Sequence, residues 1–235
     1  MNPMACLART AMAAAILVAS AASATELLID FDHHRDGRDL DVTSGQVVLD
    51  GVVLPYLAEF GLSVTERSRP GIEMRIANLT QTAEPSLDNM FHAFAPARPE
   101  PYSYRLAFDQ PVDNLSFVRV GLVAAFASHD AWTISAFDSQ GSLLGQVSEP
   151  QVSQFGNSPE AAMRGFSMPY RGIASLLVLG NLSAGGQTFE SPAIDDLRFS
   201  LAPVPEPQAW ATLALGLACI VWRAGRQTAR AGARS

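Results

Sequence analysis

Residues 102–108 read Tyr-Ser-Tyr-Arg-Leu-Ala-Phe, an alternation of large apolar side chains with polar or small ones. Successive side chains of a β-strand point to opposite faces, so four of these residues would share one face and enter a core: Tyr102, Tyr104, Leu106 and Phe108. A helical period of 3.6 residues does not fit this order. The stretch therefore predicts a half-buried β-strand, and it indicates the fold class of the chain's body.

Other short segments with a strand-like pattern lie on both sides of this stretch. Asp138-Ser139-Gln140-Gly141 is a turn signal, and it predicts a hairpin between the two runs that flank it. No helical period of useful length is evident between the termini. About ten short strands predict an all-β fold, a single jelly-roll-like β-sandwich. The other runs are Leu27 to Phe31, Gln46 to Leu54, Phe60 to Thr65, Leu115 to Val120, Trp132 to Phe137, Ser142 to Val147, Ile173 to Leu179 and Ile194 to Phe199.

The body of the chain, residues 25–202, is strongly acidic. It carries 22 acids and 11 arginines and no lysine, hence a net charge of −11. A surface of this charge repels nucleic acid and anionic lipid, and it suits a soluble extracellular module, a divalent cation or neutral sugars. The two cysteines, Cys6 and Cys219, lie outside the body. A disulfide scaffold and a cysteine metal cluster are therefore excluded, and the core alone must hold the fold.

The N-terminus, residues 1–24, has the pattern of a secretory signal peptide. Arg9 precedes the short apolar run 11–19, and Ala22 and Ala24 supply small residues at the two positions that signal peptidase reads. We predict cleavage after Ala24. The alternative is an uncleaved membrane anchor, but the apolar run is too short for a span of about 20 residues.

The C-terminus, residues 203–235, holds three blocks in a fixed order. A proline-rich segment comes first, at 203–207, and favours a stiff, extended backbone. Residues 209–222 carry no charge and predict a short transmembrane helix of about 21 Å at 1.5 Å per residue, against a hydrocarbon core of about 30 Å. Arginines follow, and the positive-inside rule would keep them in the cytoplasm as a membrane stop: Arg223, Arg226, Arg230 and Arg234.

This tripartite tail resembles the PEP-CTERM sorting signal of Gram-negative bacteria. The matching residues are Val204, Pro205, Glu206 and Pro207, the helix that ends near Trp222, and the arginine-rich end. The resemblance implies recognition by an exosortase, removal of the tail near Pro-Glu-Pro, and delivery from the inner membrane to the cell surface or an exopolysaccharide matrix. A GPI signal lacks the terminal basic block. A plain single-pass anchor needs no Pro-Glu-Pro.

The body resembles a galactose-binding-like jelly roll, as found in carbohydrate-binding modules and in many secreted exosortase substrates. The resemblance implies a fold of that kind over most of the chain. Four segments carry it: Ile29 to Asp32, Phe108 to Val112, Ala136 to Gly141 and Ala193 to Phe199.

Carboxylates gather at both ends of the body, and first and last strands of jelly rolls often lie close together. Calcium takes six to eight oxygen ligands, several of them carboxylates. We therefore predict one structural calcium held by Asp30 or Asp32 together with Asp196. The alternative is that these acids cap turns and face solvent. The full set is Asp30, Asp32, Asp36, Asp39, Asp41, Asp195 and Asp196.

The sequence favours no catalytic site. His129 and Asp130 follow Ser128, but no Gly-x-Ser-x-Gly motif accompanies them. Adjacent His33 and His34 would point to opposite faces of a strand and would not share one ion. Exposed aromatics could form a platform for sugars, although alternating aromatics usually enter a core. The candidates are Tyr56, Tyr102, Tyr104, Trp132 and Tyr170.

The features combine into one expectation: an exported bacterial envelope or matrix protein, not an enzyme, with a structural or adhesive role beside exopolysaccharide. Its expected partners are signal peptidase, an exosortase and a polysaccharide, with no cofactor beyond the calcium and no nucleic acid. One alternative is a carbohydrate-binding module proper. A second is a secreted hydrolase.

Overall fold

The computed structural model describes residues 25–43, 45–78, 89–94, 101–120, 130–151, 163–180, 192–201 and 216. Within them, eleven strands hydrogen-bond in one continuous antiparallel sheet that folds over on itself. The strands are β1 (Thr25–Ile29), β2 (Val47–Val48), β3 (Leu62–Arg67), β4 (Glu73–Asn78), β5 (Asn89–Phe94), β6 (Tyr102–Val120), β7 (Trp132–Phe137), β8 (Leu143–Glu149), β9 (Met163–Met168), β10 (Ile173–Gly180) and β11 (Ala193–Leu201).

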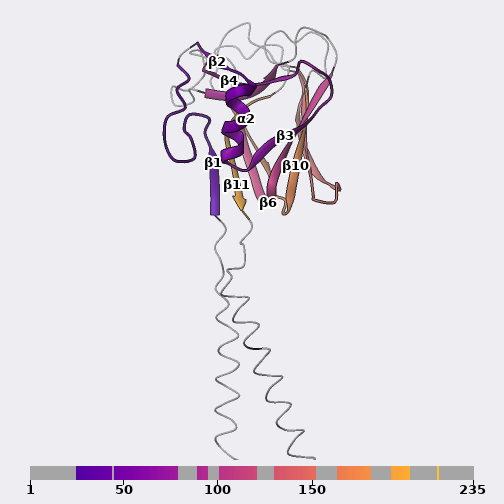
Figure 1. The fold of residues 1–235 in the computed structure, drawn as a ribbon. Helices are drawn as coiled ribbons and strands as arrows, with labels where there is room; N and C mark the ends of the chain where they lie inside the picture. Colours follow the sequence, from indigo (N-terminus) through magenta and orange to yellow (C-terminus); the bar gives the residue numbers. More distant parts are fainter. Residues whose placement is uncertain are drawn as a thin grey trace, which may run out of the picture. The chain divides into compact units, whose positions relative to one another are not determined.

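The long strand β6 connects the two layers of this sheet (Figure 1). Its first half pairs with β3 and β10, and β10 leads on to β7 and β8. Its second half pairs with β9 and β11, and β11 leads on to β5, β4 and β2. The alternation of buried residues breaks between Phe108 and Val112, and Asn114 has a φ of 54°. Two predicted strands, 102–108 and 115–120, are therefore halves of one bent strand.

The apolar face predicted for 102–108 is confirmed, because Tyr102, Tyr104, Leu106 and Phe108 are all buried. They belong to one core cluster that draws on both layers. Aromatic rings fill much of it, and the Phe31 ring stacks on that of Phe91 with centroids 5.6 Å apart. The predicted all-β sandwich is thus confirmed at the level of layers and strand pairing, with the core between the layers.

The helix α2 (Asp50–Glu59) corrects the prediction of a strand over Gln46 to Leu54, because strand structure there is limited to β2. The helix buries Val53, Tyr56 and Leu57, spaced three and four residues apart. Its first turn is fixed from outside, since Asp50 accepts a hydrogen bond from the backbone N–H of Met74 at 2.8 Å. Of the valines that suggested a strand, Val47 and Val48 form β2, whereas Val53 packs in the buried stripe of the helix.

Two predicted pairings are confirmed. β1 pairs with β11 from Thr25–Leu201 to Ile29–Leu197, so the first and last strands lie side by side. β7 and β8 form the predicted hairpin. In its turn, the carboxylate of Asp138 accepts the backbone N–H groups of Gln140 and Ser142, both at 2.8 Å.

Contacts group Thr25–Ala202 into one compact unit. In the part of the chain that the structure describes, no helix is long and apolar enough to cross a membrane. The predicted signal peptide lies outside the described residues, and so does the predicted tail, apart from Gly216.

Candidate functional site

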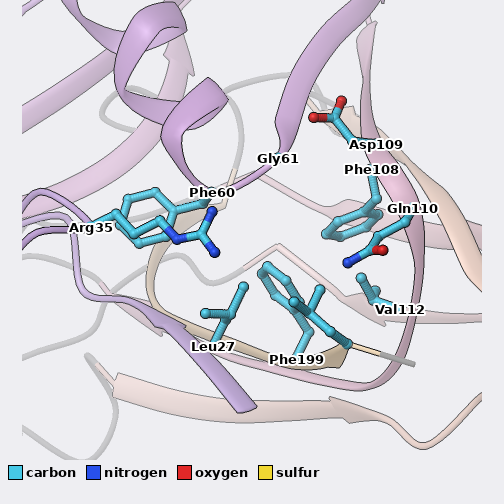
Figure 2. Close-up of a pocket in the computed structure, with 10 residues that line it drawn as sticks. Leu27, Arg35, Phe60, Gly61, Phe108, Asp109, Gln110, Val112 and Phe199 are labelled. Atoms are coloured by element: carbon cyan, nitrogen blue, oxygen red, sulfur yellow. The ribbon is translucent and has the colours of Figure 1, made fainter. Parts of the chain in front are cut away.

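A cavity of about 230 Å³ opens between β1, the turn after α2, the bend of β6 and the end of β11 (Figure 2). Its floor is apolar. The rings of Phe108 and Phe199 meet edge to face, with centroids 5.2 Å apart, and Phe60 and Val112 are buried beside them. Leu27 and Leu201 complete the wall from the paired first and last strands.

Three polar side chains surround the opening of this cavity: Arg35, Asp109 and Gln110. Figure 2 shows the guanidinium of Arg35 and the amide of Gln110 facing one another across it, while the carboxylate of Asp109 points away from the floor. Within the described residues, the side chains of Asp109 and Gln110 make no hydrogen bond. Arg35 donates from Nη1 to the backbone carbonyl of Glu59 at 2.8 Å, which leaves Nε and Nη2 for a ligand.

Local structure explains how the rim is held. The Arg35 backbone N–H donates to the Glu59 carboxylate at 3.2 Å, so the loop after β1 is tied to the end of α2. The backbone N–H of Asp109 donates to the carbonyl of Gly61 at 2.8 Å. Gly61 has a φ of 75°, a left-handed conformation that favours glycine. One cation, one carboxylate and one amide thus stand over an apolar floor, which suits a neutral polar ligand with an apolar face.

The predicted calcium ligands lie at the opposite end of the β1–β11 pair from this cavity, because Asp30 follows Ile29 and Asp196 precedes Leu197. Asp30 has the turn-capping role that the alternative assigned to it. It accepts the backbone N–H groups of Asp32 and His33, at 3.1 and 3.0 Å, and its second oxygen contacts Nδ1 of His33 at 2.8 Å. Asp196 has a φ of 48° and contacts Arg198 at 3.4 Å.

Asp195 is the buried member of this group, and the sequence prediction did not give it a role. Its side chain is fully buried, and Oδ2 has no hydrogen-bond partner. Burial raises the pKa of Asp195 to about 8, and the negative charges of Asp196, Asp32 and Asp30 act in the same direction. Among the described residues, no group of three or more His, Cys, Asp or Glu side chains is arranged to hold a metal ion. Calcium therefore stays a prediction.

A buried ion pair joins β6 to β8, and sequence reasoning missed it. Arg119 donates from Nε and Nη2 to the two carboxylate oxygens of Glu149, at 2.8 and 2.9 Å, and each side chain is 3% exposed. Trp132 donates from Nε1 to the same carboxylate at 3.3 Å. Thirty residues separate the two partners in the chain, and no local motif connects them.

Four of the candidate sugar-platform aromatics are core residues, as the alternative reading expected: Tyr56, Tyr102, Tyr104 and Trp132. Tyr170 is half-buried and packs so closely on Gly145 that a Cβ there would overlap its ring. The exposed apolar surface that the prediction required is absent at these four positions. The aromatic floor of the cavity comes instead from Phe60 after α2, Phe108 in β6 and Phe199 in β11.

The adjacent histidines contact different carboxylates. His33 lies between Asp30 and Asp39, and the hydrogen bond to Asp30 raises the pKa of His33. His34 contacts Glu59 at 2.8 Å through Nδ1. Other predicted positions lie outside the described residues: Ala22, Ala24, Ser128, His129, Val204, Pro205, Glu206, Pro207, Arg223, Arg226 and Arg230.

No family model and no curated protein matches the chain. Among solved structures, it is similar to the CBM22-1 xylan-binding domain of Xyn10C from Paenibacillus barcinonensis, with 14% identity, a TM-score of 0.36, and coverage of 79% of this chain and 99% of that one. The chain is also similar to CBM32-3 of a family 31 glycoside hydrolase from Clostridium perfringens, with 13% identity and a TM-score of 0.34. That alignment covers 60% of this chain and 92% of that one.

An arabinose-bound GH51 α-L-arabinofuranosidase, MgGH51, aligns with 74% of this chain at 13% identity and a TM-score of 0.39. The alignment spans only 26% of that enzyme's length. At such identities and TM-scores, the likeness does not extend to ligand or activity.

Proposed function

We propose that this protein is an exported bacterial envelope protein, sorted through its C-terminal tail by an exosortase, with a non-catalytic structural or adhesive role at the cell surface or in an exopolysaccharide matrix. The observation that carries the proposal is the order of blocks in residues 203–235: Pro-Glu-Pro, a short uncharged segment, then arginines. A segment of about 21 Å is a marginal anchor for a hydrocarbon core of about 30 Å. Such a tail suits temporary attachment.

The position of the sheet supports this proposal. The first strand begins at Thr25, directly after the predicted signal cleavage, and the last strand ends at Leu201, two residues before the proline-rich segment. Removing both ends would leave all eleven described strands and the core intact. The acidic body and its lack of cysteine suit an extracellular domain whose core alone holds the fold.

Intact mass of the mature protein tests the proposal at both ends. In cells with an exosortase, we expect a chain that begins at Thr25 and ends close to Pro-Glu-Pro. In cells lacking the exosortase, the chain should keep Trp222 and the arginines. A protein that retains Trp222 in both strains would contradict sorting, and one that retains Met1 would contradict the signal peptide.

A second candidate function is recognition of a neutral sugar in the cavity of Figure 2. The floor of Phe108 and Phe199 offers apolar surface to the ring of a sugar. The amide of Gln110 and the Nε and Nη2 groups of Arg35 offer donors, and the carbonyl oxygen of Gln110 offers an acceptor. Because Asp109 and Arg35 both lie at the rim, the rim has no net charge, which favours a neutral ligand over an anionic one.

Replacement of Gln110 by alanine tests this candidate. Loss of two hydrogen bonds at roughly 0.5–1.5 kcal/mol each predicts binding about tenfold weaker to a neutral polysaccharide. The measurement is affinity electrophoresis against xylan, glucan and galactan, with polygalacturonate as the anionic comparison. Gln140→Ala, in the exposed β7–β8 turn, is the matched control and should bind as the parent does. Equal binding by Gln110→Ala and the parent would exclude this cavity.

A further inference from the structure

The helix α2, which packs on β3 and β4 (Figure 1), is apolar on two opposite sides. Val53, Tyr56 and Leu57 enter the core. The side that is turned away from the core also lacks charged residues, and it continues into β2. A surface helix normally carries polar side chains outward, and a helix that is apolar all round is normally covered on every side. We name this second side the outer apolar face, and its residues are all exposed: Val47, Leu49, Val52, Pro55 and Ala58.

The outer apolar face is one continuous surface. From Leu49 to Ala58 its members follow one another at intervals of three residues, which places them along one side of the helix. Val47 precedes Leu49 by two positions of extended backbone, so their side chains point the same way. Val47, Leu49 and Val52 are 44%, 44% and 45% exposed. Single exposed apolar side chains are common on proteins, whereas a contiguous apolar patch marks an interaction site.

The two acids of α2 are both engaged within the chain. The carboxylate of Asp50 accepts from Nη1 and Nη2 of Arg67, at 2.7 and 3.1 Å. The carboxylate of Glu59 contacts Nδ1 of His34 at 2.8 Å and accepts the backbone N–H of Arg35 at 3.2 Å. A partner that covers the outer apolar face therefore meets apolar side chains, with each neighbouring carboxylate already bound.

Charge favours a second copy of this chain as that partner. The body has a net charge of −11, so two copies repel one another wherever acids would meet. The outer apolar face lets two copies touch without bringing acid against acid. A two-fold axis would place the same face on both copies, with the two α2 helices antiparallel. The N-terminal end of each helix dipole would then lie beside the C-terminal end of the other, which is favourable.

We propose that the outer apolar face is the contact between two copies of this chain, related by a two-fold axis that passes between their α2 helices. Among the described strands β2 pairs only with β4, so its outer edge borders the same interface. The ten residues of α2 span only about 15 Å, so the interface is small. A dissociation constant on the order of 100 µM follows. The proposal concerns residues 25–202 and does not depend on sorting.

Sedimentation equilibrium of the body, residues 25–202, tests the contact. The weight-average mass should rise from that of one chain towards that of two between about 1 and about 500 µM. Val52→Asp should raise the dissociation constant at least about tenfold, because it sets two like charges into an apolar contact. An acid in the first turn of a helix suits the dipole, so this variant should fold as the parent does. Circular dichroism and urea unfolding check that it does.

Leu143→Asp is the matched control. Leu143 is 56% exposed, and it lies on β8, at the other end of the strand order from β2. This variant adds the same charge to the same acidic body, so it separates loss of the contact from a general rise in repulsion. It should associate with nearly the dissociation constant of the parent.

Cross-linking tests the two-fold arrangement. The body contains no cysteine, so a single introduced thiol reports on one position. Val52→Cys should form a covalent dimer on mild oxidation at about 100 µM protein, because the axis brings the two copies of this position together. Leu143→Cys should form a covalent dimer much more slowly under the same conditions.

Three results would overturn the proposal. The first is a parent body that stays monomeric over the whole concentration range. The second is an association that Val52→Asp weakens no more than Leu143→Asp does. The third is a monomeric body that floats with phosphatidylcholine vesicles and loses this binding in Val52→Asp, which would assign the outer apolar face to a lipid surface.

Discussion

Replacement of Glu149 by glutamine is expected to lower the free energy of unfolding of the body by about 3–5 kcal/mol, because it removes the bidentate carboxylate partner from the buried guanidinium of Arg119. The two side chains are each 3% exposed and form a bidentate pair at 2.8 and 2.9 Å. For a domain of this size, the change corresponds to a fall in Tm of roughly 6–20 °C.

The size of this effect reflects burial and not the number of contacts. In water, an ion pair gains little, because the solvent screens the charges and solvates each of them well. In the interior, the opposite charge of Glu149 helps to offset the desolvation cost of Arg119. Trp132 Nε1 also donates to this carboxylate, so the substitution disturbs a second buried polar group.

Urea unfolding of the body, residues 25–202, measures the loss. Glu66→Gln is the matched control, because Glu66 pairs with Arg105 at 3.0 Å and is 65% exposed. The control should change stability by less than about 1 kcal/mol. A double variant, Arg119→Met with Glu149→Leu, should recover most of the loss, since removing both charges removes the desolvation cost. An effect of Glu149→Gln as small as that of the control would contradict the account.

Local pattern predicted several strands whose two faces differ, and it missed β5, in which both faces are buried. The alternation in 102–108 identified a buried face because one side of that strand meets the core and the other meets solvent. β5 (Asn89–Phe94) is buried at five of its six positions, so it has no alternation to detect. It was not predicted, and neither was its partner β4.

The helix α2 was missed for a related reason. The valines at 52 and 53 favour strands, while Val53, Tyr56 and Leu57 also fit a helical stripe that extends to Phe60. The contacts that decide between these readings come from afar: Arg67 and the backbone of Met74 both bind Asp50. A window of local sequence contains neither residue.

The candidate cavity could not be predicted from local sequence either. Its rim comes from positions 35, 109 and 110, and its floor from Phe60, Phe108 and Phe199. Only the pairing of the first and last strands, together with the bend in β6, brings these segments together. The sequence did predict that the first and last strands meet, because a jelly-roll-like order of strands implies it. The side chains that meet there depend on register, which alternation alone does not give.

Without calcium, the body is expected to lose about 2 kcal/mol of stability between pH 6.5 and pH 8, and the variant Asp195→Asn is expected to lose much less. Burial raises the pKa of Asp195 from about 3.8 to about 8 in the folded chain. Above the unfolded pKa, the unfolded chain releases this proton while the folded chain keeps it. The contribution of Asp195 to stability is therefore greatest at low pH and falls as pH rises towards 8, by about 1.4 kcal/mol for each unit.

The range from pH 6.5 to pH 8 is chosen because the other groups with shifted pKa values change the stability outside this range or more weakly within it. Burial lowers the pKa of His92 to about 4, so His92 reduces stability only as pH falls from about 6.5 towards 4. His33 has a raised pKa and acts in the same direction as Asp195, but its imidazole is half-exposed. Subtracting the profile of Asp195→Asn from that of the parent cancels both contributions. A difference that does not change from pH 6.5 to pH 8 would show that Asp195 is ionised in the folded chain.

Calcium would reverse this pH dependence, because a cation binds the ionised carboxylate of Asp195 and stabilises it without a proton. If Asp30 or Asp32 and Asp196 hold calcium beside Asp195, millimolar calcium at pH 8 should raise Tm in the parent and leave Asp195→Asn nearly unchanged. Calcium at 100 times its Kd stabilises the folded state by about 2.7 kcal/mol. Scanning calorimetry in calcium and in EDTA separates the two cases. Identical Tm values in both would exclude the calcium and leave Asp195 as a neutral acid, its proton held by burial and by the carboxylates around it.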